Sequence, residues 1–272
     1  LPLIRADVMQ LEMALLNLVT NAIDAMPTGG TLTITATTQP GGIRVEVMGT
    51  LAGELSAVRE YFMRYPYICL EQRASKAIGL NDDELWKGMA ASVANYLDRD
   101  GLARYFPSDW LAGSDALTAY LLQIAHDSGR EWPDEALERM LSGLEAFATG
   151  RIVRGSALPT ADLTVRKLAA IEALARHERA KAGMLDTLTI DPALWPTSAL
   201  VDWIGILQRV SGVPRRDERL KDALGLLRGR LNFQGTVMTF STERTDALWW
   251  LMVSSDVNAN RALLAVMKEG SW

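Results

Sequence analysis

From Leu51 onward, apolar residues recur at three-to-four spacing in one segment after another. Two such faces are Leu117, Tyr120, Leu121 and Ile124, and Leu200, Trp203, Ile204 and Leu207. This spacing is typical of amphipathic helices with broad apolar faces. Such faces are buried against one another, so a long series of them predicts helical hairpins stacked in layers. We expect helices at 51–63, 70–79, 83–98, 114–128, 134–148, 160–177, 197–210, 217–230, 243–253 and 256–268.

The N-terminal segment follows a different pattern. Residues 7–26 predict an amphipathic helix that ends at Pro27-Thr28-Gly29-Gly30. Apolar residues then alternate in 31–38 and again in 43–47, with a proline-glycine turn between the two runs. Alternation broken by such a turn predicts a β-hairpin. The chain is therefore expected to consist of a short helix and hairpin, residues 1–48, followed by a mainly helical domain, residues 49–272.

Composition excludes several classes of function. The chain has 272 residues, 49% of them hydrophobic, which is enough for a sizeable core. A net charge of −5 gives no general attraction to nucleic acid or to an anionic membrane. No apolar run approaches the roughly 20 residues that span a bilayer, and the N-terminus does not resemble a signal peptide. One cysteine and two separated histidines predict neither a metal site nor a cofactor.

The single cysteine has a distinctive neighbour. Cys69 stands three residues before Gln72, at the predicted start of a helix. A turn there brings the sulfur against the side-chain carbonyl of Gln72. Displacement of ammonia by the thiol would give an internal thioester, an activated acyl group whose thiolate leaves far more readily than an amide nitrogen. Such a bond needs cover from water, and Tyr65 and Tyr67 lie just upstream.

The motif and its surroundings resemble one family. The relevant segments are Tyr65-Pro66-Tyr67-Ile68-Cys69-Leu70-Glu71-Gln72, Asp100-Gly101-Leu102-Ala103-Arg104-Tyr105-Phe106-Pro107, Leu117-Thr118-Ala119-Tyr120, Trp195-Pro196-Thr197 with Asp202-Trp203, Phe233-Gln234-Gly235-Thr236 and Asp256-Val257-Asn258-Ala259-Asn260-Arg261. Together they resemble the thioester domain of bacterial α2-macroglobulins over about residues 43–272. The resemblance implies an α/α toroid of inner and outer helices, left incomplete because the C-terminus resembles the middle of a longer family segment.

The same resemblance implies a function. The thioester would join Cys69 and Gln72, with Leu70 and Glu71 completing the motif and Tyr65 covering the bond. Such proteins are protease inhibitors and not enzymes, because a lysine amine of the trapped protease attacks the Gln72 carbonyl and stays attached. The family implies a periplasmic or envelope-associated location and proteases as partners.

Residues 7–48 resemble a second family. Gln10-Leu11-Glu12, the run 15–26 and Gly29-Gly30-Thr31-Leu32 are similar to the ATP-binding domain of sensor histidine kinases. The resemblance implies that Asn21 occupies the position that holds magnesium on the nucleotide. It stops at Val47-Met48-Gly49-Thr50-Leu51, where the family has its adenine-binding loop. Because such magnesium sites need nucleotide phosphates as co-ligands, we expect Asn21 to be vestigial and an ATP-binding module to be the alternative function, inactive as a fragment.

Two other interpretations of Cys69 stay open. It could be a catalytic nucleophile with His126 or His177 as its base, although no motif links the cysteine to either histidine. It could equally be an inert buried residue. Some complement relatives carry a histidine that redirects acyl transfer to hydroxyl groups, but neither His126 nor His177 matches that position. The sequence therefore predicts transfer to amines.

Overall fold

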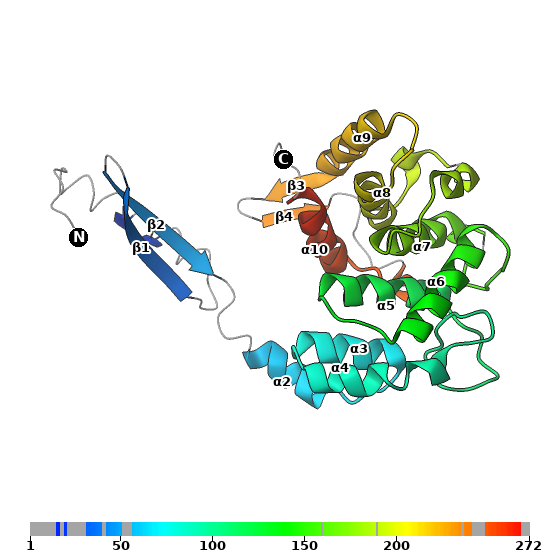
Figure 1. Ribbon diagram of the computed structural model, residues 1–272. Helices are drawn as coiled ribbons and strands as arrows, with labels where there is room; N and C mark the ends of the chain where they lie inside the picture. The colour runs from blue at the N-terminus through cyan, green and yellow to red at the C-terminus, as the bar shows by residue number, and fades with distance from the viewer. Residues whose placement is uncertain are drawn as a thin grey trace. The chain divides into compact units, whose positions relative to one another are not determined.

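The computed structural model describes residues 15–16, 19–20, 31–39, 42–50, 56–158, 160–188, 190–234, 237–240 and 248–267. The chain divides into two compact units, residues 1–64 and 65–272 (Figure 1). Within the described part of the chain, no helix is both long enough and apolar enough to cross a membrane.

The first unit contains the expected β-hairpin. Strand β1 (Thr31–Gln39) pairs antiparallel with β2 (Gly42–Thr50), and Gln39 lies opposite Gly42. Helix α2 (Ser56–Arg64) follows. Most of the predicted helix at 7–26, including Asn21, lies outside the described residues. The predicted kinase-type magnesium position thus stays a prediction.

The second unit is built from helices. They are α3 (Leu70–Gly79), α4 (Asp83–Ala90), α5 (Asp115–Asp127), α6 (Asp134–Ala148), α7 (Leu163–Arg176), α8 (Thr197–Arg209), α9 (Arg216–Gly229) and α10 (Ser255–Val266). Short 3₁₀ turns are η1 (Val93–Tyr96), η2 (Ala182–Thr187), η3 (Pro192–Leu194) and η4 (Trp249–Leu251). Strands β3 (Leu231–Gln234) and β4 (Val237–Phe240) form a second antiparallel hairpin.

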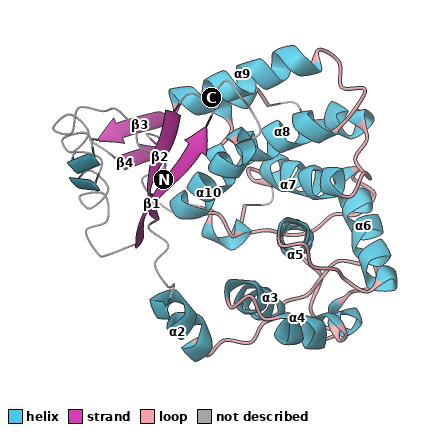
Figure 2. Ribbon diagram, turned by 60° about the vertical axis from the view of Figure 1, so that its left-hand side comes forward, coloured by secondary structure: helices cyan, strands magenta, loops and turns pink. Residues whose placement is uncertain are grey.

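The helices of this unit form two layers. Helices α3, α5, α7, α8 and α10 pack each against the next, and α5, α7, α8 and α10 together line one cavity. Helices α4, α6 and α9 pack on the outside of this series, α4 on α3, α6 on α5 and α7, and α9 on α8 (Figure 2). The arrangement has the layered helices that the apolar faces predict, and it is consistent with the mainly helical toroid that the family resemblance implies.

Burial follows the same layering. Inner helix α8 is buried along most of its length, whereas outer helices α4 and α9 bury only a few positions each. The core contains Leu117 and Leu121 of α5, Leu168 of α7 and Leu207 of α8, all fully inaccessible. Burying a leucine contributes about 1.5–3 kcal/mol, so the shared apolar core accounts for the cohesion of the layers.

Two of the expected helices differ clearly from the prediction at one end. The helix expected at 83–98 ends at Ala90, and the chain then turns so that both carboxylate oxygens of Asp98 accept bonds. Asp98 accepts from the N–H groups of Asp100, Leu102 and Gly113, each over 2.9 Å, and from Arg154 over 2.7 Å. Burial alone would raise the pKa of Asp98, but these donors outweigh it and hold the pKa below its ordinary value. A buried, fully bonded carboxylate fixes a loop there in place of more helix.

The other boundary concerns the helix expected at 160–177, which begins at Leu163. Asp162 stands at its N-cap, but its carboxylate bonds to Arg166 and to the indole N–H of Trp250. The β3–β4 hairpin is a larger difference, since the strand signal was expected to end at about Leu51. Gly235-Thr236 between two apolar runs is the hairpin signal that identifies it.

Close packing of α6 against the 98–103 loop leads to a stability prediction. A Cβ added at Gly143 would lie 2.6 Å from the carbonyl oxygen of Asp100, whereas one at Gly88 would meet nothing within 4 Å. Gly143→Ala should therefore cost about 1–3 kcal/mol through overpacking. Gly88→Ala, on the exposed side of α4, should stabilise by about 0.5–1 kcal/mol. Urea unfolding of the two variants beside the wild type measures both; equal effects would contradict the observed contact.

Candidate functional site

Cys69 and Gln72 meet at the first turn of α3. Cys69 is the N-cap residue, and its side chain faces the backbone N–H of Gln72. In return, the Gln72 side-chain oxygen accepts the backbone N–H of Cys69 over 3.3 Å. This reciprocal arrangement is a capping box, in which the residues at the N-cap and three positions later fold back toward each other. The thiol and the carboxamide therefore lie at the same end of the helix.

The local environment of Cys69 is largely dry. Its side chain is buried, with only 7% of the residue exposed. Burial raises the pKa of the thiol, the charge of Glu71 raises it further, and the backbone N–H groups of Gln72 and Glu71 oppose the rise. The Leu70 N–H donates to the carbonyl of Tyr105 over 2.9 Å, so the chain at 105 closes over the helix end.

Glu71 lies beside the pair and is held by a chain of hydroxyl groups. The Cys69 thiol donates to Glu71 Oε2 over 3.9 Å, and the Ser75 hydroxyl lies 3.0 Å from Glu71 Oε1. Ser75 Oγ is in turn 2.7 Å from the hydroxyl of Tyr120 on α5.

Burial, with the charges of Glu71 and Cys69, raises the pKa of Tyr105 to about 12. Ser75 and Tyr105 were not expected from the sequence, although Ser75 shares the helix face of Glu71 at four-residue spacing.

A cavity opens directly on Gln72. It has a volume of about 560 Å³ and is lined by Glu71, Gln72, Tyr105, Asp115, Trp250 and Met252, among others. The Trp250 indole N–H donates to Asp162 over 3.1 Å, which ties η4 to the start of α7. The site thus combines a buried thiol, a carboxamide that borders a cavity, and an aromatic wall.

A buried ion pair forms part of the wall of this cavity. Arg166 on α7 binds both oxygens of Asp115 on α5, over 2.9 and 2.5 Å. Both side chains are nearly inaccessible. Burial alone would lower the pKa of Arg166, but Asp115 and Asp162 outweigh it and raise the pKa. This pair joins α5 and α7 directly behind the site.

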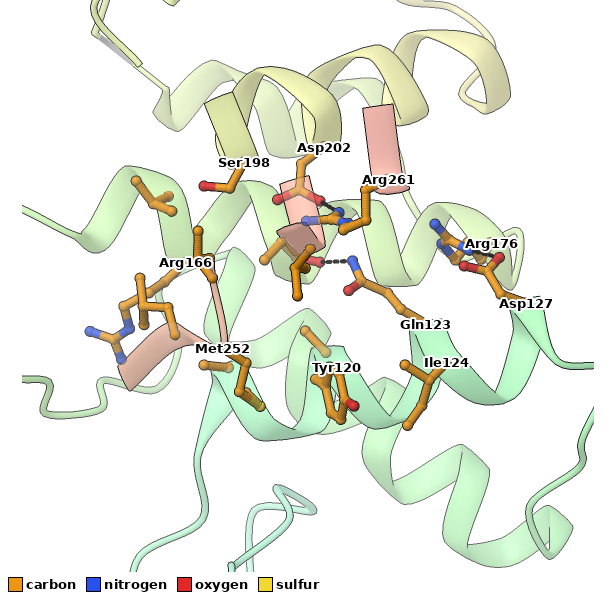
Figure 3. Close-up of a pocket in the computed structure, with 17 residues that line it drawn as sticks. Tyr120, Gln123, Ile124, Asp127, Arg166, Arg176, Ser198, Asp202, Met252 and Arg261 are labelled. Atoms are coloured by element: carbon orange, nitrogen blue, oxygen red, sulfur yellow. Dashed lines mark hydrogen bonds and ion pairs between the residues drawn. The ribbon is translucent and has the colours of Figure 1, made fainter. Parts of the chain in front are cut away.

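A second cavity, of about 160 Å³, lies between the inner helices (Figure 3). Tyr120 and Gln123 of α5 line one side, with Asp202 of α8 and Arg261 of α10 opposite, and Arg261 pairs with Asp202. Nearby, Glu172 on α7 binds Arg176 over 2.8 Å, Arg209 over 3.3 Å and Gln123 over 2.7 Å. These bonds cross-link α5, α7, α8 and α10, so they hold the layers in register.

The other residues singled out from the sequence lie as follows. Tyr65 is half-buried and packs edge-on against Tyr67, with ring centroids 5.3 Å apart, while Tyr67 is 61% exposed. Leu70 is fully buried in the core beneath the motif. His126 and His177 lie at the ends of α5 and α7, and the fold brings their rings into edge contact, with centroids 5.8 Å apart. Among the described residues, no group of three or more His, Cys, Asp or Glu side chains could hold a metal ion.

Comparison with known proteins bears on the fold. No protein-family model matches the chain, and no curated protein matches it. Two solved structures of Salmonella alpha-2-macroglobulin do match, one reacted with methylamine and one a tyrosine-to-glycine mutant. Each has a TM-score of 0.53 and 20% identity, and the match covers 79% of this chain and 15% of theirs. This is a fold found in bacterial alpha-2-macroglobulin.

A third structure, native Escherichia coli alpha-2-macroglobulin from domain MG7 to the C-terminus, matches with a TM-score of 0.48 and 19% identity. That match covers 63% of this chain and 31% of the other. The chain therefore spans less than a third of the length of each of these three structures. The mainly helical toroid is common to this chain and the Salmonella proteins.

Proposed function

We propose that Cys69 and Gln72 form an internal thioester and that the domain traps proteases through it. The observation that carries this proposal is the capping box, which folds the thiol and the carboxamide toward each other at the N-terminus of α3. The burial of Cys69 and the fold shared with bacterial alpha-2-macroglobulin support it. A Salmonella relative of this fold was crystallised after reaction with methylamine, an amine like the one that the proposal requires.

The geometry suits acyl transfer from sulfur to nitrogen. An amine that enters the cavity beside Gln72 adds to the carbonyl carbon and places negative charge on the carbonyl oxygen. The Cys69 N–H already points at that oxygen, and a preorganised donor of this kind stabilises the developing charge. The C–S bond then breaks and thiolate leaves, while the amide to the amine stays. The acyl group is consumed once, so the domain is a stoichiometric inhibitor and not an enzyme.

The nucleophile in this proposal is a lysine amine on a protease. A surface lysine carries a flexible four-carbon stem ending in an amine, which can reach into a recess that a backbone cannot enter. No cofactor or metal takes part. We propose that the domain works in the periplasm or at the cell envelope, and its likeness to the bacterial proteins of this fold supports this.

Thiol titration tests the proposal. The folded chain should show no titratable thiol until methylamine is added, after which one thiol should appear per chain and the methylamine should be found on residue 72. A thiol that titrates fully in the denatured, untreated chain would mean that Cys69 is an inert or simply unreacted residue. Amine found on other glutamines at the same yield would point to non-specific chemistry.

Shielding by Tyr65 gives a further prediction. Tyr65 is half-buried and Tyr67 is largely exposed, so we expect Tyr65 to protect the site more than Tyr67 does. Tyr65→Ala should speed the reaction with methylamine, and hydrolysis, severalfold, because water and amine gain access to the bond. Tyr67→Ala is the matched control and should have the smaller effect. Rates of thiol release measure both, and an unchanged rate in Tyr65→Ala would remove this residue from the proposed shield.

A further inference from the structure

The carboxylate of Glu71 accepts a hydrogen bond from the reacting thiol and is a group that can take its proton. Glu71 Oε2 lies 3.9 Å from Cys69 Sγ and is the acceptor of the thiol. The opposite oxygen, Oε1, is fixed by the Ser75 hydroxyl at 3.0 Å. One oxygen of the carboxylate is thus bonded to Ser75 of the same helix, and the other faces the sulfur.

We infer that Glu71 is the catalytic base that forms the thioester, taking the proton of the Cys69 thiol and delivering it to the departing ammonia. This inference rests on the proposed thioester. It assigns to Glu71 a role in making the bond, before any protease is met.

The step balances without any added reagent. Glu71 accepts the thiol proton as the sulfur lone pair attacks Cδ of Gln72, so the C–S bond forms. The carbonyl oxygen carries the charge of the tetrahedral intermediate, facing the Cys69 N–H. The C–N bond then breaks, and the nitrogen leaves with the proton that Glu71 returns. A thiol and a primary amide have become a thioester and ammonia, and Glu71 ends as it began.

The surroundings make such a base necessary. Burial raises the pKa of the Cys69 thiol, so the sulfur keeps its proton at neutral pH and is a poor nucleophile until the proton is removed. Other nearby groups are unsuited to this role. The raised pKa of Tyr105, about 12, keeps its hydroxyl protonated, and both oxygens of Asp115 bind Arg166. Glu71, by contrast, accepts from two neutral groups, the thiol and the Ser75 hydroxyl.

Ser75 and Tyr120 act as positioning residues in this arrangement. Ser75 sits one turn after Glu71 on α3, and its hydroxyl contacts both the backbone carbonyl and the carboxylate of Glu71. Tyr120, from α5, lies 2.7 Å from Ser75 Oγ and limits its rotation. The proton acceptor is therefore oriented by two adjacent inner helices, so the base is in place only once α3 and α5 have packed.

The test follows re-formation of the bond in the whole chain. Ammonia opens the thioester and restores the Gln72 amide and the Cys69 thiol; after ammonia is removed, loss of the thiol and the return of the lighter mass report the forward reaction. Glu71→Gln keeps the shape of the side chain and an oxygen that accepts from Ser75, but it lacks the negative charge of the carboxylate. It should slow re-formation about 10²–10⁴-fold, the range for loss of a general base. Glu84→Gln, the same change on the exposed first turn of α4, should leave the rate unchanged.

A second readout separates catalysis from a structural effect. Glu71→Asp, which keeps the carboxylate on a shorter stem, should recover part of the rate that Glu71→Gln loses, whereas a purely structural role would not distinguish the charged residue from the neutral one. Should Glu71→Gln fail to fold, Ser75→Ala and Tyr120→Phe take its place and should each slow re-formation severalfold. Equal rates in the wild type and the folded Glu71→Gln variant would overturn the assignment. A wild-type chain that never becomes lighter by ammonia would instead overturn the proposed thioester itself, and the role of Glu71 with it.

Discussion

Gln72→Glu should abolish the incorporation of methylamine while leaving the fold intact. A glutamate at the third helical position can still accept the Cys69 N–H, because glutamate and glutamine serve equally in a capping box. Its carboxylate, however, cannot be attacked by a thiolate, since it carries negative charge and has no ammonia to lose. The variant therefore removes the reactive carboxamide and keeps the helix cap, so the two roles of residue 72 can be measured separately. Labelled methylamine counted per chain, with helix content followed by circular dichroism, measures both effects.

Gln72→Ala is the companion variant for this experiment. It removes the Gln72 half of the capping box as well as the acyl group, so it should lose both methylamine incorporation and stability, the latter by about 0.3–1.5 kcal/mol. Incorporation near one per chain in Gln72→Glu would show that the reactive carbonyl is elsewhere. Loss of the fold in Gln72→Glu would show that the two side chains do not form the observed cap.

Arg166→Met should be the most destabilising single change considered for this chain. Arg166 binds both oxygens of Asp115 and also contacts Asp162, and all three side chains are almost completely buried. Removing the arginine leaves two buried carboxylates without their cation, and breaking a buried pair in this way costs about 3–5 kcal/mol. Urea unfolding measures the loss. Methylamine incorporation should fall in parallel, because the pair forms part of the wall of the cavity beside Gln72.

Two controls accompany this variant. Arg179→Met breaks ion pairs with Glu138 and Glu145 on the outer surface, and solvent-exposed pairs of this kind contribute little to stability. Arg166→Met combined with Asp115→Leu should recover part of the loss, because one of the stranded charges is then removed. Arg166→Met unfolding at the same urea concentration as Arg179→Met would mean that the buried pair does not hold α5 to α7.

The fold was largely predictable because apolar spacing is a local signal. The expected ranges 70–79 and 134–148 coincide with α3 and α6, and 114–128 and 197–210 differ from α5 and α8 by at most one residue at either end. Prediction was wrong where a long-range bond decides the structure. The helix expected at 83–98 ends at Ala90, ahead of the loop in which Asp98 binds Arg154, a partner more than fifty residues away. Hairpin β3–β4 was missed because its strands are short and follow a long helical series.

Of the candidate site, only the two residues of the proposed thioester could be predicted from the sequence. The spacing of Cys69 and Gln72 is visible in the sequence because four residues of one helical turn suffice to bring them together. Tyr105, Tyr120 and Trp250 come from other elements, so no spacing reveals that they surround the motif. The contact of His126 with His177 was hidden in the same way. Coverage of the bond by the half-buried Tyr65 stays a prediction.

Intact mass of the native, untreated chain is the most direct measurement of the central claim. If Cys69 has displaced ammonia from Gln72, the chain weighs one ammonia less than its sequence requires. Methylamine should then raise the mass by one methylamine and expose one thiol. A native chain at the full sequence mass, unchanged by methylamine and with its thiol free from the start, would contradict the account.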